Sequence, residues 1–381
     1  MKLVVLDANA FWTEQLYSAC ARFADVLLLK PRDFRAHHQI HGDWRSDAAP
    51  RKISERVWEQ CFSMPPGWMF SLWPLAERAM AKHVRQFVGG DQFVLVITYP
   101  QYRSLVRRLR PALSIYYNLD DYSDNWPSRA KAIAEWEHET VSDMHLTICI
   151  AQRRQEELRK RVAEKAGFIF HLPLGCTPQF MSGASSRPEI PSVLQKISRP
   201  IAGYIGALNS RFDFEFLSEV AERSPAVSFV LGGKMPSREQ GSASWWLGCE
   251  RAGSLANVHF IGWVEHDELG EYLNAFDLLL MCYSDCRFNR NASPAKLWDY
   301  LGTGLPIVAN DRNPETLLWR EVIQIGENPE IFARRLREAL TIESAALRER
   351  RLEIARAHTW EVLSRRWERI IEEVSLHADQ A

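Results

Sequence analysis

The sequence predicts an α/β protein with two doubly wound domains that face a cleft. Three observations support this fold class. Short apolar runs alternate with amphipathic helical patterns along most of the 381 residues, as they do where crossover helices join parallel strands. A Ser- and Gly-rich stretch at residues 182–188 interrupts the alternation once and separates two such series. The chain is also long enough for each series to enclose its own core.

The first series contains six short apolar runs, which we interpret as buried strands of one parallel sheet, with four helical patterns between them. The strands are Leu3–Leu6, Asp25–Leu29, Phe93–Thr98, Ser114–Asn118, Leu146–Ile150 and Phe168–Leu172, the last of which closes the sheet. The helices are Thr13–Phe23, Leu72–Phe87, Arg129–Val141 and Gln152–Glu164.

The second series begins after the interruption and again alternates apolar strands with amphipathic helices. Its strands are Ile201–Ile205, Ser228–Leu231, Val258–Ile261, Leu278–Cys282 and Ile307–Ala309. Its helices are Phe214–Arg223, His266–Ala275, Pro294–Leu301 and Pro329–Thr341. A last helix, Trp360–Val374, lies beyond what the second sheet needs.

Composition limits the partners and the compartment. The formal net charge is −1, so no overall field recruits nucleic acid, and we predict no nucleic-acid partner. No apolar run approaches the roughly 18–20 residues of a membrane span, and the first run reaches Asp7 too soon for a signal peptide. The seven cysteines contain no C-x-x-C pair, which is typical of reduced thiols. These observations predict a cytoplasmic protein.

The most informative helix lies at Pro294–Leu301. We predict Ser293 as its N-cap, Pro294 as its first residue, and Gly302 and Gly304 as its end. Lys296 then lies in the first turn, where a cation is unfavourable by roughly 0.3–1 kcal/mol. A bound anion reverses that sign, because free N–H groups and the ammonium would both face it.

Asp299 follows Lys296 by three residues and shares its helix face. A carboxylate there could accept the hydroxyls of a ribose while Lys296 holds phosphates. The alternative is a surface lysine beside a solvated aspartate, because exposed charged pairs are common.

Several segments resemble a known family. Ser293–Ala309, SPAKLWDYLGTGLPIVA, resembles the donor-site segment of GT-B-fold glycosyltransferases, and Asn257–Tyr283 and Gly203–Leu208 are similar to earlier parts of the same domain. The helix that begins at Trp360 is similar to one that crosses back onto the N-terminal domain. As an ordered set these segments are specific. Tyr116–Ser123 resembles a segment of bacterial exopolysaccharide and teichuronic-acid glycosyltransferases, a subgroup that includes glucuronosyltransferases.

The resemblance implies two Rossmann-like domains with different ligands. Residues 1–182 would form the acceptor-binding domain, 183–199 a linker, 200–359 the nucleotide-sugar-binding domain, and 360–381 a helix that packs on the first domain. The co-substrate would be a nucleotide-diphosphate sugar, with UDP as the expected nucleotide, and no cofactor would be tightly bound. The acceptor would be a hydroxyl of a glycan, a lipid-linked molecule or a small molecule, in polysaccharide or glycoconjugate synthesis.

Further residues are expected at the donor site. Gly206 ends the first strand of the second series, where backbone must approach a pyrophosphate closely. Tyr283 follows another strand and would line the donor pocket or pack in the core. Asn291 stands where retaining relatives often carry a glutamate, so the resemblance favours inversion.

Asp120 and Asp121 directly follow a predicted strand and are the candidate catalytic residues. An inverting transferase needs a carboxylate to take the proton of the acceptor hydroxyl, and Asp120 is the first choice. Alternatively one of them caps a turn, since Asp is a frequent turn residue. Asp120, Asp121 and Asp124 could also offer oxygens to a metal, but we expect none, because Lys296 and the helix end already neutralise a leaving diphosphate.

The segment Arg32–Arg85 mixes basic residues with aromatic ones. One interpretation is a peripheral surface at the inner face of the membrane that reaches a lipid-linked acceptor. The other is an ordinary packed excursion over the first domain. The aromatic residues are Trp44, Trp58, Trp68, Phe70 and Trp73.

Two other functions fit the same residues. A nucleotide-sugar epimerase of this fold would need the same diphosphate site but no acceptor. A non-catalytic subunit would bind nucleotide sugars or glycans without turnover.

Overall fold

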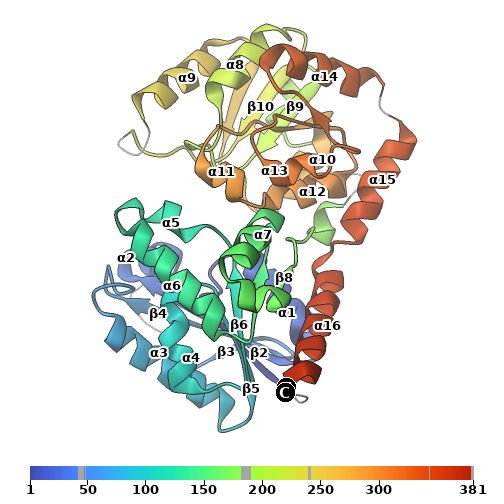
Figure 1. Cartoon of the computed structure of the whole chain (residues 1–381). Coiled ribbons are helices and arrows are strands. Elements are labelled where there is room, and N and C mark those ends of the chain that lie inside the picture. Colours follow the sequence, from blue (N-terminus) through green and yellow to red (C-terminus); the bar gives the residue numbers. More distant parts are fainter. Residues whose placement is uncertain (42–46, 48, 182–189, 239–241, 343, 379–381) are drawn as a thin grey trace. The chain divides into compact units, whose positions relative to one another are not determined.

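A computed structural model of the chain describes residues 1–41, 47, 49–181, 190–238, 242–342 and 344–378. The chain divides into two compact units. The first consists of Met1–Pro173 with Trp360–Ala381, and the second of Leu174–Thr359. Each is an α/β unit with helices on its sheet (Figure 1).

The first unit is built on an eight-stranded sheet of order β3-β4-β2-β1-β5-β6-β7-β8. All neighbouring strands are parallel except β3, which is antiparallel to β4. The strands are β1 (Lys2–Leu6), β2 (Asp25–Asp33), β3 (Arg51–Ser54), β4 (Val57–Met64), β5 (Phe93–Ile97), β6 (Leu113–Asn118), β7 (Leu146–Cys149) and β8 (Ile169–His171).

All six strands predicted in this half are present, but β3 and β4 were not predicted. The reason lies in β4, where Glu59 and Gln60 interrupt the apolar run although both side chains are buried. Glu59 is neutralised by Lys30 of β2 at 2.5 Å. Because β4 contains a buried ion pair, its sequence lacks the unbroken apolar run from which a buried strand is predicted.

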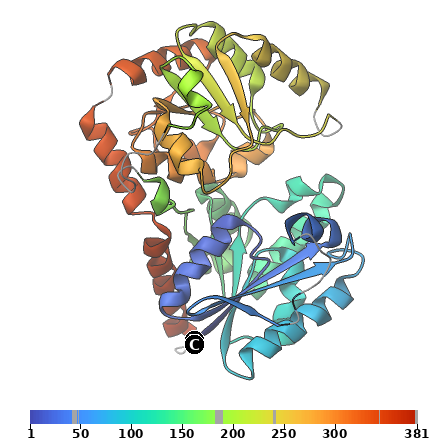
Figure 2. The ribbon, with the colours of Figure 1, turned by 180° about the vertical axis from the view of Figure 1, so that it is seen from behind.

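The helices of the first unit include one from the end of the chain. They are α1 (Phe11–Ala19), α2 (Phe34–His41), α3 (Trp73–Val88), α4 (Arg103–Leu109), α5 (Tyr122–Asn125), α6 (Ala130–Asp143), α7 (Gln152–Arg161) and α16 (Trp360–Ala378). Helix α16 lies beside α1 (Figure 2), where the fully buried Trp367 meets the ring of Tyr17 edge-on at 5.7 Å. The predicted final helix is therefore part of the first unit.

The second unit contains a six-stranded parallel sheet of order β11-β10-β9-β12-β13-β14. Its strands are β9 (Ile201–Ile205), β10 (Ser228–Gly232), β11 (Val258–Gly262), β12 (Leu278–Met281), β13 (Ile307–Ala309) and β14 (Gln324–Ile325), of which only the two-residue β14 was not predicted. Its helices are α8 (Phe214–Glu222), α9 (Ala243–Ser254), α10 (Leu269–Ala275), α11 (Arg287–Asn291), α12 (Ala295–Thr303), α13 (Pro314–Leu317), α14 (Pro329–Thr341) and α15 (Ala345–Arg356).

The boundary between the units falls earlier than the sequence suggests. Residues 174–182 were expected in the first domain, yet the chain joins the second unit from Leu174. Cys176 N–H donates to the His358 carbonyl (2.8 Å), and Thr177 N–H donates to the Asp299 carboxylate (3.0 Å). These contacts with the second unit set the boundary. Of the expected linker, residues 183–189 lie outside the described residues, and Leu194–Lys196 form a short 3₁₀ helix.

Several described aromatic residues of the segment 32–85 pack within the first unit, among them Trp58, Trp68, Phe70 and Trp73. Trp68 is buried and stacks near Trp73 and Tyr102, whereas Trp44 lies outside the described residues. Exposed apolar side chains do occur in the same segment, at Phe34, Ile40, Ile53 and Leu75. In the described part of the chain, no helix has both the length and the apolar character needed to cross a bilayer.

Candidate active site

Helix α12 of the second unit begins directly after a proline. Pro294 occupies the N-cap position with extended backbone (φ −76°, ψ 109°), and no side chain caps the helix. The predicted N-cap role of Ser293 is therefore wrong by one position. The fixed φ of proline suits the cap, and the Pro294 carbonyl accepts a hydrogen bond from Leu297 N–H at 3.1 Å. The first amide groups of α12 are left without a side-chain cap, and Gly304 ends the helix in the left-handed conformation.

The ammonium of Lys296 packs against one tyrosine. Nζ is 2.5 Å from the Tyr204 hydroxyl and 3.8 Å from the centroid of its ring. Burial lowers the pKa of Lys296 to about 7, against the opposing effect of Cys282. Within the described residues, no carboxylate pairs with this ammonium. A half-buried lysine without a described counter-ion, at an uncapped helix start, is the arrangement that suits an anionic ligand.

Gly206 lies directly against the Lys296 ammonium. A Cβ atom at Gly206 would be 2.7 Å from Nζ, so a side chain here would displace the lysine. The neighbouring turn is equally tight, because a Cβ atom at Gly233 would lie 1.8 Å from the Gly206 carbonyl oxygen. The structure therefore brings Gly206 and Lys296 together at the carboxyl ends of β9 and β10, where ligands bind to open parallel sheets.

Tyr283 follows β12 and is buried close to this group. Its backbone is fixed by Asn310, which accepts from Tyr283 N–H (3.2 Å) and donates to its carbonyl (2.7 Å). Burial raises the pKa of Tyr283 well above its ordinary value, and Tyr204 and Tyr300 add to the rise, so the hydroxyl stays protonated. No described residue pairs with that hydroxyl, which leaves it available to a ligand.

Asp299 lies one turn after Lys296 but contacts a different neighbour. Its carboxylate accepts a hydrogen bond from Thr177 N–H at 3.0 Å. Burial raises the pKa of Asp299 to about 7, although the backbone and side chain of Thr177 act in the opposite direction. The structure thus does not pair Asp299 with Lys296. A carboxylate has about four acceptor sites, so two bonds from Thr177 leave capacity for a ligand hydroxyl.

Asp120 and Asp121 belong to the first unit, at the carboxyl end of β6, and have different surroundings. Asp121 is buried and caps α5, accepting from the N–H (3.2 Å) and the hydroxyl (2.5 Å) of Ser123. Asp120 is more exposed. The pKa of Tyr99 is raised by burial first, with Asp7 and Asp120 adding to the effect. Asp121 therefore has the capping role that the sequence left open for one of the two residues, and Asp120 is the more accessible carboxylate.

A buried polar network supports the backbone of Asp120. The Asn118 amide donates to the Asp120 carbonyl (3.1 Å) and to the Glu137 carboxylate (3.1 Å). Glu137 is neutralised by Arg154 at 2.7 Å and by Arg161. The network fixes the turn that presents Asp120. Among the described residues, no three His, Cys, Asp or Glu side chains gather in a way that could hold a metal ion.

The chain is similar to known proteins in sequence and in structure. Residues 211–372 match the protein family described as Glycosyl transferase-like. TuaH of Bacillus subtilis (strain 168), named for teichuronic acid biosynthesis, is 23% identical over 297 residues, which cover 73% of this chain and 71% of TuaH.

Solved structures match almost the whole chain. Sucrose-phosphate synthase from Thermosynechococcus elongatus superposes with a TM-score of 0.75 at 14% identity, covering 99% of this chain and 100% of that chain. HepE from Anabaena, in complex with UDP, gives a TM-score of 0.70 at 14% identity, covering 98% and 100%. An E. coli trehalose-6-phosphate structure bound with UDP-2-fluoro glucose gives 0.72 at 12% identity, covering 98% and 99%.

The chain has the GT-B fold, and its residues 211–372 are similar to a glycosyltransferase domain. The expected fold class is thereby confirmed, and the matched region of the chain contains Ser293–Ala309 and Asn257–Tyr283, two of the segments on which the resemblance depends.

Two further candidate site residues, Arg211 and Asp7, were not predicted from the sequence. Arg211, in the loop between β9 and α8, is exposed, and its charge acts on the hydroxyl of Tyr204, the partner of Lys296. Asp7 follows β1 as Asp120 follows β6, and it accepts a hydrogen bond from the Tyr102 hydroxyl at 2.7 Å. Asp7 has a positive φ of 59°, which is rare outside glycine and typical of functional sites. Its position directly after the first strand was the signal available in the sequence.

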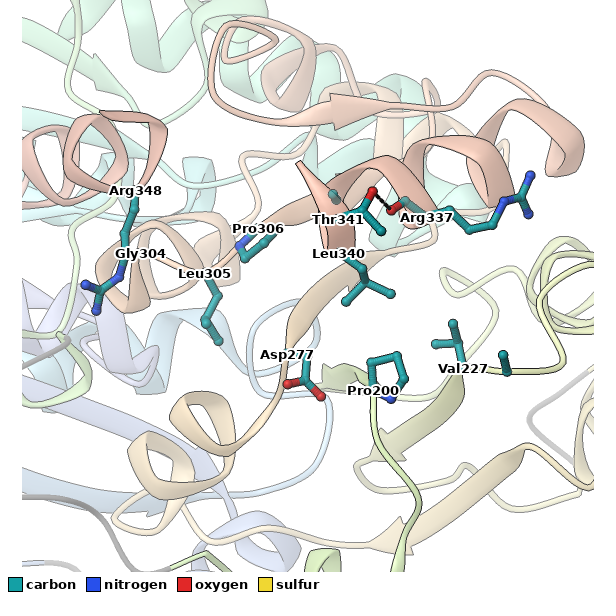
Figure 3. Close-up of a pocket in the computed structure, with 12 residues that line it drawn as sticks. Pro200, Val227, Asp277, Gly304, Leu305, Pro306, Arg337, Leu340, Thr341 and Arg348 are labelled. Atoms are coloured by element: carbon teal, nitrogen blue, oxygen red, sulfur yellow. Dashed lines mark hydrogen bonds between the residues drawn. The ribbon is translucent and has the colours of Figure 1, made fainter. Parts of the chain in front are cut away.

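A large cavity of the second unit lies away from these residues. It measures about 630 Å³, and Pro200, Val227, Asp277 and Pro306 on its wall each precede a strand. Figure 3 shows these residues with Arg337 and Arg348 on opposite sides of the group. The cavity is therefore at the amino ends of the strands, whereas Gly206 and Tyr283 follow strands. Ligands of open parallel sheets bind at the opposite, carboxyl ends of the strands, so this cavity does not mark the candidate site.

Proposed function

We propose that the protein transfers a sugar from a nucleotide-diphosphate sugar, with UDP as the nucleotide, to a hydroxyl of a glycan or lipid-linked acceptor in polysaccharide or glycoconjugate synthesis. One observation carries the proposal: the Lys296 ammonium, unpaired with any carboxylate in the described chain, at the uncapped start of α12. A diphosphate is the anion that suits this combination. HepE bound to UDP and the E. coli structure bound to UDP-2-fluoro glucose, which share the fold, support the choice.

The donor is held by the second unit. Lys296 and the first amides of α12, preceded by Ser293 and Pro294, bind the diphosphate, and Gly206 allows the close approach of backbone. The Asp299 carboxylate accepts a hydrogen bond from a ribose hydroxyl with its remaining lone pairs. The buried hydroxyl of Tyr283 forms a hydrogen bond with the sugar donor.

The chemistry is a single displacement with inversion. The acceptor oxygen attacks the anomeric carbon, and the bond from that carbon to the diphosphate oxygen breaks with its electron pair on the leaving group. Asp120 takes the proton of the acceptor hydroxyl. Lys296 and the α12 amides stabilise the charge that develops on the leaving diphosphate, so the mechanism invokes no metal.

A lipid-linked acceptor would bring the protein to a membrane surface. The exposed side chains Phe34, Ile40, Ile53 and Leu75 offer apolar contacts for such a peripheral, cytoplasmic-side association. A glycan acceptor requires no such contact, and both acceptor classes use the same reaction.

The test is a panel of UDP-, GDP-, TDP- and CMP-sugars given to the full chain, with and without glycan and lipid-linked acceptors. We expect one nucleotide class to bind in calorimetry and mass spectrometry to detect a glycosylated acceptor. Epimerised donor in the absence of acceptor would identify an epimerase instead. Binding without any product would indicate a non-catalytic subunit, and failure of every donor to bind would contradict the proposal.

Donor binding is expected to depend on pH through Lys296. Its pKa is about 7 in the free protein, and a bound diphosphate raises it, so binding takes up a proton above pH 7. The favourable contact is complete below pH 7 and is lost as pH rises through the raised value of the complex. Affinity should fall by up to about tenfold per pH unit above 7. A UDP-sugar is the suitable probe, because its diphosphate has no terminal phosphate that titrates near neutrality.

Calorimetry from pH 6 to 9 checks this prediction. Asp299 titrates in the same range, so the series should be repeated in Asp299→Asn to isolate the lysine. The decline that persists in Asp299→Asn should be absent when Lys296→Met is added to that variant. A flat profile in the unmodified protein would mean that Lys296 does not contact the diphosphate.

A further inference from the structure

A second pocket, in the first unit, has no role in the donor site. Its volume is about 330 Å³, and it lies among the starts of α3, α4 and α6. Six of its lining residues matter for what it could bind: Phe70, Trp73, Gln101, Arg103, Arg129 and Trp136. They combine aromatic faces, one amide and two guanidinium groups.

The aromatic walls are preorganised. The rings of Phe70 and Trp136 stack with centroids 6.3 Å apart and planes 28° apart. Trp73 is fixed by a hydrogen bond from its indole N–H to the Ser104 hydroxyl at 2.9 Å. Flat aromatic faces suit the apolar C–H face of a pyranose ring, because the rings lose little conformational freedom on binding.

The side-chain amide of Gln101 suits a ligand that both donates and accepts hydrogen bonds. Its Nε2 and Oε1 atoms are both buried, and no described residue forms a hydrogen bond with either. Buried amides are normally paired at both ends. Adjacent hydroxyl groups of a sugar supply one acceptor for Nε2 and one donor for Oε1, which an apolar ligand cannot do.

The charge of the lining is positive, and one guanidinium is left for the ligand. Among the described lining residues there are two arginines and no carboxylate. Arg103 is neutralised by Glu139 (2.5 Å) and Asp143 (3.4 Å). Arg129 is exposed and lies over the Phe70 ring at 4.4 Å, with no carboxylate partner in the part of the chain that the structure describes. Guanidinium groups bind carboxylates and phosphates through paired hydrogen bonds.

We propose that this pocket binds an acidic saccharide, with a pyranose ring against the aromatic walls, its hydroxyls on Gln101 and its carboxylate or phosphate on Arg129. This saccharide is the acceptor of the reaction. That assignment as acceptor rests on the proposed function, whereas binding of the saccharide by the pocket does not.

The test measures binding to the full chain without nucleotide sugar, by saturation-transfer NMR titration. The probes are a glucuronate-containing disaccharide, its neutral glucose counterpart and glucose 6-phosphate. We expect at least one acidic probe to bind about tenfold or more tightly than the neutral one, since charge-assisted bonds are roughly twice as strong as neutral ones. Which acidic probe binds distinguishes a carboxylate ligand from a phosphate ligand.

Matched variants locate the interaction. Arg129→Gln should remove the preference for the acidic probe, and Gln101→Leu should weaken binding of every probe that binds. Lys131→Gln removes an exposed charge from the same helix region and should leave binding unchanged. Arg129 is exposed, so its replacement is compatible with folding, which unchanged thermal unfolding would verify.

Two results would overturn the inference. One is equal affinity for acidic and neutral probes, and the other is an unchanged acidic preference in Arg129→Gln. Binding of a UDP-sugar is measured in a separate sample. A protein that binds its donor but none of the saccharides contradicts this inference alone, and a protein that binds the saccharides but no donor contradicts the proposed donor site alone.

Discussion

Replacing Lys296 with methionine is expected to lower kcat/KM for sugar transfer by about 10²–10³-fold, because a charge-assisted contact to the leaving diphosphate is lost. That range corresponds to roughly 3–4 kcal/mol of transition-state stabilisation. Donor affinity should fall as well, since the ammonium contacts the diphosphate before it leaves. Steady-state kinetics with saturating acceptor and calorimetry with the UDP-sugar measure the two effects.

The same substitution should leave the fold intact. Burial lowers the pKa of Lys296 to about 7, which means that the folded protein disfavours the charged form of this lysine. Below pH 7 the methionine variant should therefore unfold at the same or a higher temperature than the unmodified protein. Lys234, an exposed lysine after the turn of β10, is the matched control, and Lys234→Met should keep activity within about threefold. If Lys296→Met keeps more than a tenth of the activity, the donor site lies elsewhere.

Replacing Asp120 with asparagine is expected to lower kcat by about 10²–10⁴-fold, the usual range for the loss of a general base. Affinity for the UDP-sugar should not change, because the donor residues belong to the second unit. Asparagine keeps the size of the side chain, so the Asn118 contact to the Asp120 carbonyl can persist. Pre-steady-state measurement of the transfer step separates this effect from slow product release.

Asp121 provides the control for this substitution. Asparagine is as good an N-cap as aspartate, so Asp121→Asn should preserve α5 and retain most of the activity. The opposite pattern, an inactive Asp121 variant beside an active Asp120 variant, would reverse the assignment. Should both remain active, Asp7 is the next carboxylate to test, since it also follows a strand of the same sheet.

The buried strands could be predicted from the sequence where their residues form an unbroken apolar run. This holds for β1, β5 and β9, whose residues are nearly all apolar. It fails for β4, because Glu59 is stabilised by Lys30, a residue 29 positions earlier in the sequence. Only the folded sheet brings the two together, so no local pattern contains the information.

Some residues of the candidate site could likewise be predicted from local sequence, and others could not. Lys296 could be predicted, because its conflict with the helix dipole is local and visible in the sequence. The pairing of Lys296 with Tyr204 and of Asp299 with Thr177 spans 92 and 122 residues and depends on the fold. The N-cap position was misassigned by one residue because Ser293 and Pro294 both have suitable chemistry, and only the backbone angles distinguish them.

The packing of α16 on α1 also determines the order in which the protein can be completed during synthesis. The second unit is continuous in sequence, from Leu174 to Thr359. All its strands can therefore pair before translation of the chain is complete. The first unit is discontinuous: Tyr17 and Phe23 are made early but receive Trp367 only with the last helix. A nascent first unit therefore carries an uncovered aromatic surface throughout translation of the second, and a fragment of residues 1–173 would keep that surface permanently.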